Sequence, residues 1–296
     1  MTFFVKYIFF LIVISFTTVR ASFPGFDAFT SSKRLSLAGA GLLQSSAISS
    51  LINPSIYDKK TFSLSIIRYP ASIISQSAGM VLPLRRGYWH FSINNISYGV
   101  FQGYNINAES TGTYDSNDTR LISSYSQSLT LVPINIGLSV SYFNSNYERY
   151  NLNIFSFAFG GHINLEKYKA LIGLSAHQIG LSYGNMEINM HPKLALSASK
   201  RLQYLPSSIY IDLINSRSKT EVFTGIITDI NEKIKFFIGS STMKGKHNLK
   251  DNLLKSLLGA SGIGFSYIES SFSMHYGLFF YGTGSLNSGI ELSINI

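Results

Sequence analysis

Hydrophobic and polar residues alternate along most of this chain, most clearly at its C-terminal end. Ile290, Leu292, Ile294 and Ile296 alternate with glycine or polar residues, the period of two that is typical of a β-strand with one apolar face. From residue 61 onward, similar segments are separated by turn-forming residues. The pattern predicts fourteen strands, at residues 61–69, 74–82, 88–98, 119–131, 135–144, 150–163, 168–178, 193–202, 207–215, 221–229, 233–241, 260–268, 271–280 and 287–296.

An even number of two-faced strands favours an all-β, antiparallel transmembrane barrel. Closing the last strand onto the first removes both exposed sheet edges. Within residues 135–144, Leu138 lies on the face that we expect to meet lipid, and Ser139 on the wet face. The three longest predicted connections, residues 99–118, 179–192 and 242–259, all fall on one side. This asymmetry is typical of outer-membrane barrels, whose extracellular loops are long and whose periplasmic turns are short.

The first 21 residues have the pattern of a secretory signal peptide. Lys6 precedes the apolar run 7–16, and Val19-Arg20-Ala21 forms a Val-x-Ala cleavage site. The run is too short for a comfortable transmembrane helix, so we expect cleavage after Ala21 and export.

Residues 22–58 do not alternate and are rich in small and apolar residues. Gly39 and Gly41 permit a tight turn or close packing. Asn53 is suited to hydrogen-bond the turn before Pro54 ends the segment. We interpret residues 22–58 as an N-terminal hatch, a short and partly helical plug inside a barrel formed by residues 59–296.

Composition supports this class. The chain is 45% hydrophobic and 14% aromatic but only 13% charged, and no run after residue 21 is long and apolar enough for a membrane helix. These features predict a protein of the bacterial outer membrane. The formal net charge of +9 is scattered along the chain, so we expect contact with lipid, lipopolysaccharide or another acidic polymer, and no nucleic-acid binding.

No motif in the sequence predicts catalysis, a metal or a cofactor. Ser241 and Lys244 fit Ser-x-x-Lys but lack the partner motifs of that chemistry. The histidines lack metal-ligand spacing; they are His90, His162, His177, His191, His247 and His275. We therefore expect a protein that is not an enzyme.

Two predicted loops differ in charge and are candidates for contact with partner proteins. Residues 99–118 contain acidic but no basic residues, whereas residues 242–259 contain mainly basic ones. Opposite charge of this kind is suited to steering and orienting a partner. The candidate contact residues are Glu109, Asp115, Asp118, Lys244, Lys246, Lys250 and Lys255.

The order of several segments resembles a known family. A glycine and small-residue run at 33–41 leads to the Asn-Pro of 46–54 and is followed by similar segments. The chain is similar to the PorV/PorQ proteins, which are outer-membrane components of the type IX secretion system, and within that family it resembles PorQ more than PorV. These proteins in turn resemble the FadL-type fourteen-stranded barrels with a hatch. The other matching segments are 23–29, 96–103, 112–115, 137, 142–150, 179–180 and 284–293.

The resemblance implies a non-enzymatic role in type IX secretion and surface attachment of cargo, in which the barrel anchors partner proteins. The alternative is a FadL-like passive transporter for a hydrophobic or small ligand, with the hatch as its plug. A transporter needs an apolar pocket beside the hatch or a gap in the wall, whereas a scaffold can fill its lumen with side chains.

Overall fold

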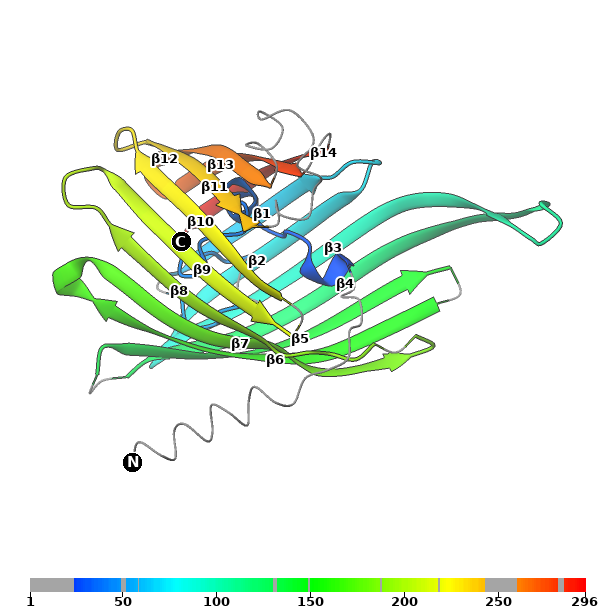
Figure 1. Cartoon of the computed structure of the whole chain (residues 1–296), viewed down its shortest axis with the longest axis horizontal. Coiled ribbons are helices and arrows are strands. Elements are labelled where there is room, and N and C mark those ends of the chain that lie inside the picture. The colour runs from blue at the N-terminus through cyan, green and yellow to red at the C-terminus, as the bar shows by residue number, and fades with distance from the viewer. Residues whose placement is uncertain are drawn as a thin grey trace.

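The computed structural model describes residues 24–48, 52–57, 59–129, 132–148, 150–186, 188–217, 219–242, 260–281 and 285–296. They form a closed barrel of fourteen strands, each hydrogen-bonded to its neighbours in the chain (Figure 1). The strands are β1 (Thr61–Arg68), β2 (Ile74–Leu84), β3 (Gly87–Tyr104), β4 (Ser110–Ser128), β5 (Ile134–Tyr147), β6 (Tyr150–Leu165), β7 (Ala170–Gly184), β8 (Lys193–Arg201), β9 (Ser207–Ser216), β10 (Lys219–Asp229), β11 (Ile234–Ser241), β12 (Ser261–Glu269), β13 (Phe272–Tyr281) and β14 (Ser285–Asn295).

The barrel closes where β14 pairs with β1 in antiparallel register, from Thr61 opposite Asn295 to Arg68 opposite Ser288. Neither strand is left with an unpaired edge along this register, which removes the sites at which an open sheet would recruit another strand. The prediction of a fourteen-stranded antiparallel barrel is confirmed.

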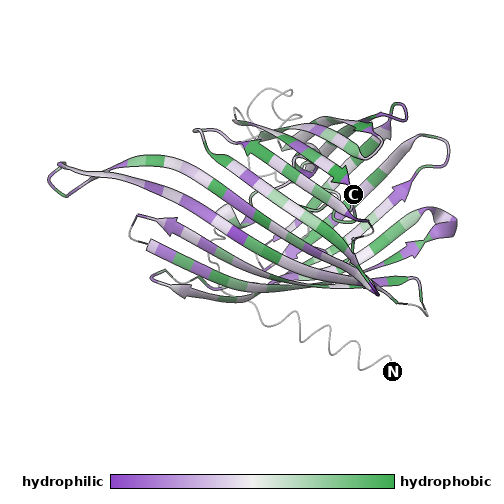
Figure 2. Ribbon diagram, turned by 180° about the vertical axis from the view of Figure 1, so that it is seen from behind, coloured by the Kyte–Doolittle hydropathy of each residue, from purple (hydrophilic) through white to green (hydrophobic). Residues whose placement is uncertain are grey.

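The two faces of the wall differ as the alternation predicts. Leu138 is 43% exposed on the outside, whereas Ser139 is 2% exposed on the inside. Apolar and polar bands alternate along the strands that face the viewer in Figure 2. The outer face therefore suits contact with lipid and the inner face suits polar packing. No helix in the described ranges is long and apolar enough to cross a membrane.

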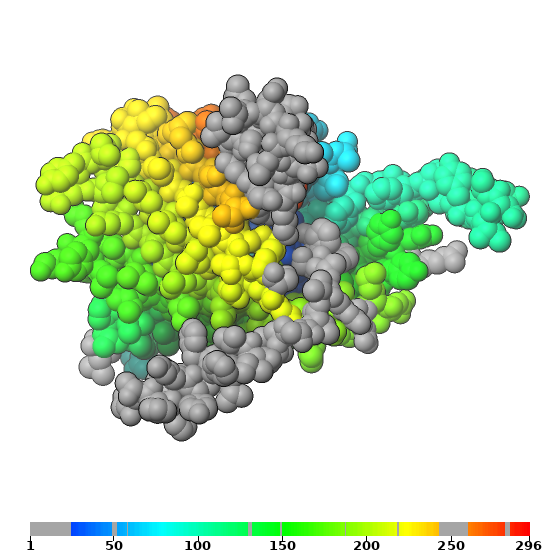
Figure 3. Space-filling model, viewed as in Figure 1, coloured from blue at the N-terminus to red at the C-terminus, as the bar shows by residue number. Residues whose placement is uncertain are grey.

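The strands differ in length around the barrel. The tall wall, β3 to β7, has strands of 14 to 19 residues. The short wall, the other nine strands, has strands of 8 to 11 residues. The β3–β4 hairpin projects beyond the rest of the barrel (Figures 1 and 3).

This hairpin corrects the prediction of a long loop at residues 99–118. β3 and β4 remain paired as far as Tyr104 and Ser110, with irregular register near Gly99 and near the tip. Asp118 does not lie in a loop: it is 1% exposed inside the barrel. The prediction failed because a strand outside the membrane has no apolar face to produce hydrophobic alternation.

Candidate functional site

The described part of the hatch, residues 24–48 and 52–57, begins with the 3-10 helix η1 (Pro24–Asp27) and continues into the short helix α2 (Ser32–Ser36). Ser31 caps α2 by accepting a hydrogen bond from the Arg34 backbone. Gly39 and Gly41 follow with φ of +96° and +91°, a conformation that glycine adopts without the penalty of a Cβ. Together these residues fold the segment back on itself within a few turns.

Two carboxylates on the barrel wall hold the hatch. Asp212 of β9 accepts hydrogen bonds from the backbone N–H groups of Gly41 (2.7 Å) and Leu42 (3.2 Å). Glu291 of β14 accepts one from the Ser31 hydroxyl (2.6 Å) and lies 3.3 Å from the Lys33 ammonium. Both carboxylates are 1% exposed, so these hydrogen bonds offset the cost of burying charge.

Three buried histidines of the wall also contact the hatch. The His90 ring nitrogen lies 2.6 Å from the Ala47 carbonyl, and its ring stacks on that of Tyr57 at 4.7 Å. His275 bonds Ser36 at 3.1 Å. His162 bonds Ser55 at 2.9 Å. Each histidine therefore ties one part of the hatch to a different strand.

The Asn-Pro turn closes the hatch before β1 begins. The Asn53 side-chain oxygen accepts hydrogen bonds from the Ser55 backbone (3.1 Å) and hydroxyl (2.7 Å), a local turn that asparagine favours. Pro54 lies against Gly137 of the wall, where an added Cβ would be 2.3 Å from the Pro54 carbonyl oxygen.

Glycines in the short wall let the hatch touch the barrel backbone. A Cβ on Gly239 would lie 2.0 Å from the Leu37 carbonyl carbon, and one on Gly262 would lie 2.4 Å from the Ser36 carbonyl oxygen. A side chain at Gly239 or Gly262 would push the hatch away. We call this group the glycine seat; its members, on β10 to β14, are Gly225, Gly239, Gly262, Gly277 and Gly289.

A cavity of about 880 Å³ lies beside the hatch and is lined by residues of both walls, toward the rim that carries the β1–β2, β7–β8 and β9–β10 connections. Its hatch side is apolar and includes Phe26, Phe29 and Ile52. The part of its lining on β5 and β6 includes four small side chains at one level, Ser139, Ser141, Ser156 and Ala158. A volume of this size is within the range of small-molecule sites.

Positive charge exceeds negative charge around this cavity. Lys193 pairs with Asp27 at 2.9 Å, and Lys219 pairs with Glu221. The guanidinium of Arg120 donates to the Phe26 carbonyl at 2.7 Å and lies 3.9 Å from the Phe26 ring centroid. The remaining charged residues that line the cavity are also basic, namely Arg34 and Arg217.

The pKa of Asp27 reflects two opposing influences. Burial alone would raise this pKa, but the Lys193 ammonium and hydrogen bonds from Lys193 and Gln178 outweigh burial and lower it. Asp27 therefore remains a carboxylate and holds the first turn of the hatch beside the cavity.

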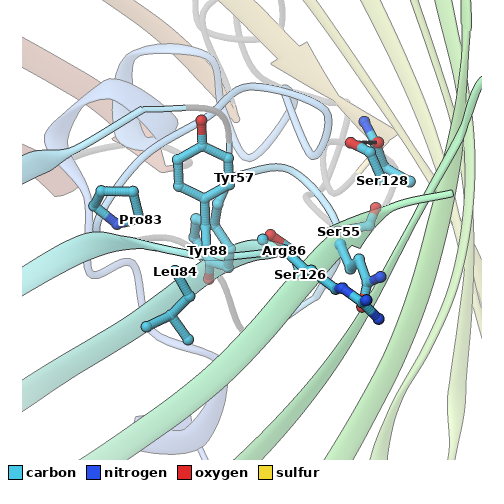
Figure 4. Close-up of a pocket in the computed structure, with 11 residues that line it drawn as sticks. Ser55, Tyr57, Pro83, Leu84, Arg86, Tyr88, Ser126 and Ser128 are labelled. Carbon is cyan, nitrogen blue, oxygen red and sulfur yellow. Dashed lines mark hydrogen bonds between the residues drawn. The ribbon is translucent and has the colours of Figure 1, made fainter. Parts of the chain in front are cut away.

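A second cavity, of about 230 Å³, lies at the opposite rim, near the β2–β3 and β4–β5 turns. Ser55 and Tyr57 of the hatch line it, together with Arg86 and Tyr88 of the wall (Figure 4). The hatch thus contributes to the lining of a large cavity on one side and a small one on the other.

The predicted site residues fall in three places. Gly39, Gly41, Asn53 and Pro54 are in the hatch. Glu109 is at the tip of the projecting hairpin, and Asp115 is on its exposed part. Asp118 is inside the barrel, where it accepts a hydrogen bond from Tyr98 at 2.6 Å. Four residues lie outside the described ranges: Lys244, Lys246, Lys250 and Lys255.

The sequence analysis did not identify Asp212, Glu291 or the glycine seat. Alternation placed Asp212 and Glu291 on the inner face. An acidic residue on that face was the one sequence feature that could have indicated a contact with the hatch. The partner of each carboxylate is more than 150 residues away in the chain, so local periodicity carries no information about it.

No protein-family model and no curated protein sequence matches this chain. Solved structures of outer-membrane barrels are similar to it. A deletion mutant of the TodX monoaromatic hydrocarbon channel has a TM-score of 0.52 at 11% identity, covering 90% of this chain and 98% of that one. A FadL homologue from Pseudomonas aeruginosa has a TM-score of 0.51 at 9% identity, with the same coverage. These similarities show the fold: a fourteen-stranded barrel of the outer-membrane class.

Proposed function

We propose that this protein is a passive outer-membrane channel in which the hatch controls passage of a small amphipathic ligand. The proposal includes export by a signal peptide at residues 1–21 and insertion through the apolar outer band. One observation carries it: a cavity of about 880 Å³ lies directly beside a hatch that noncovalent contacts hold in the lumen. A scaffold protein has no need for such a space.

The cavity lining indicates the chemistry of the ligand. Aromatic rings of Phe26, Phe29, Phe223 and Phe279 favour an apolar body, because burial of apolar surface stabilises binding. The excess of basic over acidic side chains favours a negatively charged or strongly polar group at one end. The name of the TodX channel specifies a monoaromatic hydrocarbon, which agrees with the apolar part of this proposal.

Removing the hatch tests this function. A variant that keeps residues 1–21 and lacks residues 22–54 should still insert, because the apolar outer band belongs to the strands. It should conduct ions several-fold better than the intact protein in a planar bilayer. A variant that inserts but conducts no better than the intact protein would contradict the proposal.

A second candidate function is the anchoring of partner proteins in type IX secretion. The projecting hairpin favours it: Val100, Tyr104 and Ile106 are 71%, 64% and 103% exposed, and the acidic Glu109 is at the tip. Large exposed apolar groups outside the membrane often mark protein contacts.

The two functions can be separated by shortening the hairpin. Joining Gly103 to Gly112 through a short turn removes the exposed tip and leaves the hatch and cavity unchanged. A channel should then transport its ligand normally, whereas a secretion scaffold should lose attachment of cargo at the cell surface.

A further inference from the structure

The outer face of the tall wall changes character abruptly along a single row of residues. Strand registers place five neighbouring residues in one apolar row, in which Ile93, Leu121, Phe155 and Leu181 are 43% to 78% exposed. The full row is Ile93, Leu121, Tyr142, Phe155 and Leu181. Side chains of this kind suit the upper boundary of the lipid-facing band, where aromatic residues gather.

The next two rows on the same face contain no carboxylate and no basic side chain, and they are dominated by amides. The first row consists of Asn95, Thr119, Asn144, Asn153 and Tyr183, and the second of Ser97, Asn117, Asn146 and Asn151. Five strands about 4.8 Å apart give this amide surface a width of roughly 19 Å.

Four of these asparagines form a closed ring of hydrogen bonds across β5 and β6. Asn144 donates to Asn153 (2.8 Å), Asn153 to Asn151 (2.5 Å), Asn151 to Asn146 (2.5 Å) and Asn146 to Asn144 (2.8 Å). The Tyr142 hydroxyl also donates to Asn153, at 2.7 Å. The ring fixes the orientation of all four amides in advance.

A primary amide can donate two hydrogen bonds and accept two. The ring uses one donor and one acceptor of each asparagine, so the other N–H of each side chain is available to an outside group. Beside the ring, Tyr183 is 51% exposed and offers an aromatic surface. Fixed neutral donors and acceptors next to an aromatic ring match the hydroxyl groups and apolar faces of sugars, whereas a phosphate would be better matched by Arg or Lys.

We propose that the amide surface binds the neutral saccharide headgroup of glycolipids in the leaflet around the barrel. Its position carries this choice of occupant. The amide rows continue directly from the apolar row, so the molecules whose chains contact Leu121 and Phe155 place their headgroups against the amides. The inference rests on the proposed membrane location, but it adds a lipid-selecting site outside the channel.

The test uses the full-length protein in phosphatidylcholine vesicles that contain spin-labelled digalactosyldiacylglycerol. Electron paramagnetic resonance gives the fraction of this lipid that is immobilised at the protein. The protein should select the galactolipid over spin-labelled phosphatidylcholine, and the double variant Asn144→Ala/Asn151→Ala should lose about fivefold of that selectivity, the equivalent of one net hydrogen bond.

The matched control is Asn215→Ala/Thr220→Ala, which removes a single exposed pair on the short wall, in which Asn215 donates to Thr220 at 2.9 Å. It should keep full selectivity. Equal selectivity in the ring variant and the intact protein would overturn the proposal, as would absence of selectivity in the intact protein. Selection of spin-labelled phosphatidylglycerol that is lost with the ring would overturn it in favour of an anion site.

Two further measurements keep the outcome interpretable. The heat-dependent gel mobility of folded barrels shows whether the ring variant is folded, and the milder Asn146→Ser substitution replaces it if it is not. Conductance of the same vesicles should not change in the ring variant. Loss of galactolipid selectivity with normal conductance supports the saccharide site, and this result does not depend on whether the protein is a channel.

Discussion

The short wall and the tall wall face the same lumen but treat the hatch differently. On the short wall, glycines on five consecutive strands leave little room between the barrel and residues 32–40, and at Gly239, Gly262 and Gly277 the hatch backbone touches the wall backbone. On the tall wall, Ser139, Ser141, Ser156 and Ala158 line open space at the level of the large cavity. The hatch therefore packs closely along the short wall, whereas on the tall wall its contacts, such as that of Pro54 with Gly137, leave open space at the level of the large cavity.

The difference shows how small a change decides whether a barrel is filled. Glycine and serine are both small, but glycine permits backbone contact, whereas a serine hydroxyl keeps neighbours away and can bind water. The glycine row of the short wall lets the hatch pack against it, whereas the serines of β5 and β6 line the large cavity.

The outer faces of the two walls should respond alike to an added charge, even though their inner faces differ. Leu138→Arg on β5 and Ile211→Arg on β9 each place a charge in lipid, and each should destabilise the barrel by about 2 to 4 kcal/mol if the position is near the midplane. Ser139→Arg should be tolerated, because its side chain enters the cavity. Urea titration of folded and unfolded gel bands measures the effect, and equal harm from Leu138→Arg and Ser139→Arg would show that the faces of β5 are reversed.

The carboxylate of Asp212 on β9 should contribute a large fraction of the free energy that holds the hatch in place. Asp212→Ala leaves the N–H groups of Gly41 and Leu42 without their acceptor, which should cost about 1.5 to 3 kcal/mol. We expect faster proteolysis of residues 24–48 and higher conductance. Asp229→Ala, at the exposed end of β10, is the control, and similar proteolysis rates in the two variants would argue against a latch.

The glycine seat can be tested with one added side chain. Gly239→Val should push Leu37 away from the wall, and overpacking of this kind costs about 1 to 3 kcal/mol. Gly161→Val is the matched control, because a Cβ there meets nothing closer than 3.4 Å. Open-channel noise should increase only in the first variant. If both variants gave quiet channels, the hatch would not depend on the seat.

Acid should loosen the first turn of the hatch on the cavity side. The lowered pKa of Asp27 means that its pairing with Lys193 contributes fully above the ordinary value of 3.8 and is lost as pH falls through the lower folded value. An ion pair that is partly exposed contributes about 0.2 to 1 kcal/mol. Hydrogen exchange of the backbone amides of residues 24–30 is measured against pH, and the intrinsic pH dependence of exchange is subtracted. In the intact protein, exchange should accelerate below pH 3.8. In Asp27→Asn, exchange should be independent of pH. The same pH dependence of exchange in the intact protein and in Asp27→Asn would contradict a role for the Asp27–Lys193 pair.

Topology gives a further check on the projecting hairpin. A label at Asn107 should react in intact cells, and a label at Arg86, in the β2–β3 turn, should react only after the outer membrane is broken. Reaction of both labels in intact cells would contradict the assignment of the two rims.

The sequence was sufficient to predict the number of strands and which residues face out of the barrel. Both follow from hydrophobic alternation, which is a property of each strand alone. Leu138 and Ser139 show this, since each lies on the predicted face. Alternation failed where β3 and β4 leave the membrane, and it therefore placed Asp118 in a loop. A strand in water on both faces has no apolar side, so its sequence resembles a polar loop.

The site was less predictable. Gly39, Gly41 and Asn53 stood out because turns require such residues, but the roles of Asp212 and Gly239 depend on which hatch residue meets them. That pairing arises only when the barrel closes around the hatch. The resemblance to secretion components remains a proposal, and the observed cavity favours a channel.

A reversible lock tests the proposal that movement of the hatch opens the channel. The chain contains no cysteine, and the Ser32 Cβ lies 3.2 Å from where a Cβ on Gly289 would be, so Ser32→Cys/Gly289→Cys places two thiols within reach of each other. Oxidation should hold the hatch on the short wall and suppress ligand flux into vesicles, and reduction should restore it. Equal flux in the oxidised and reduced states would contradict the account.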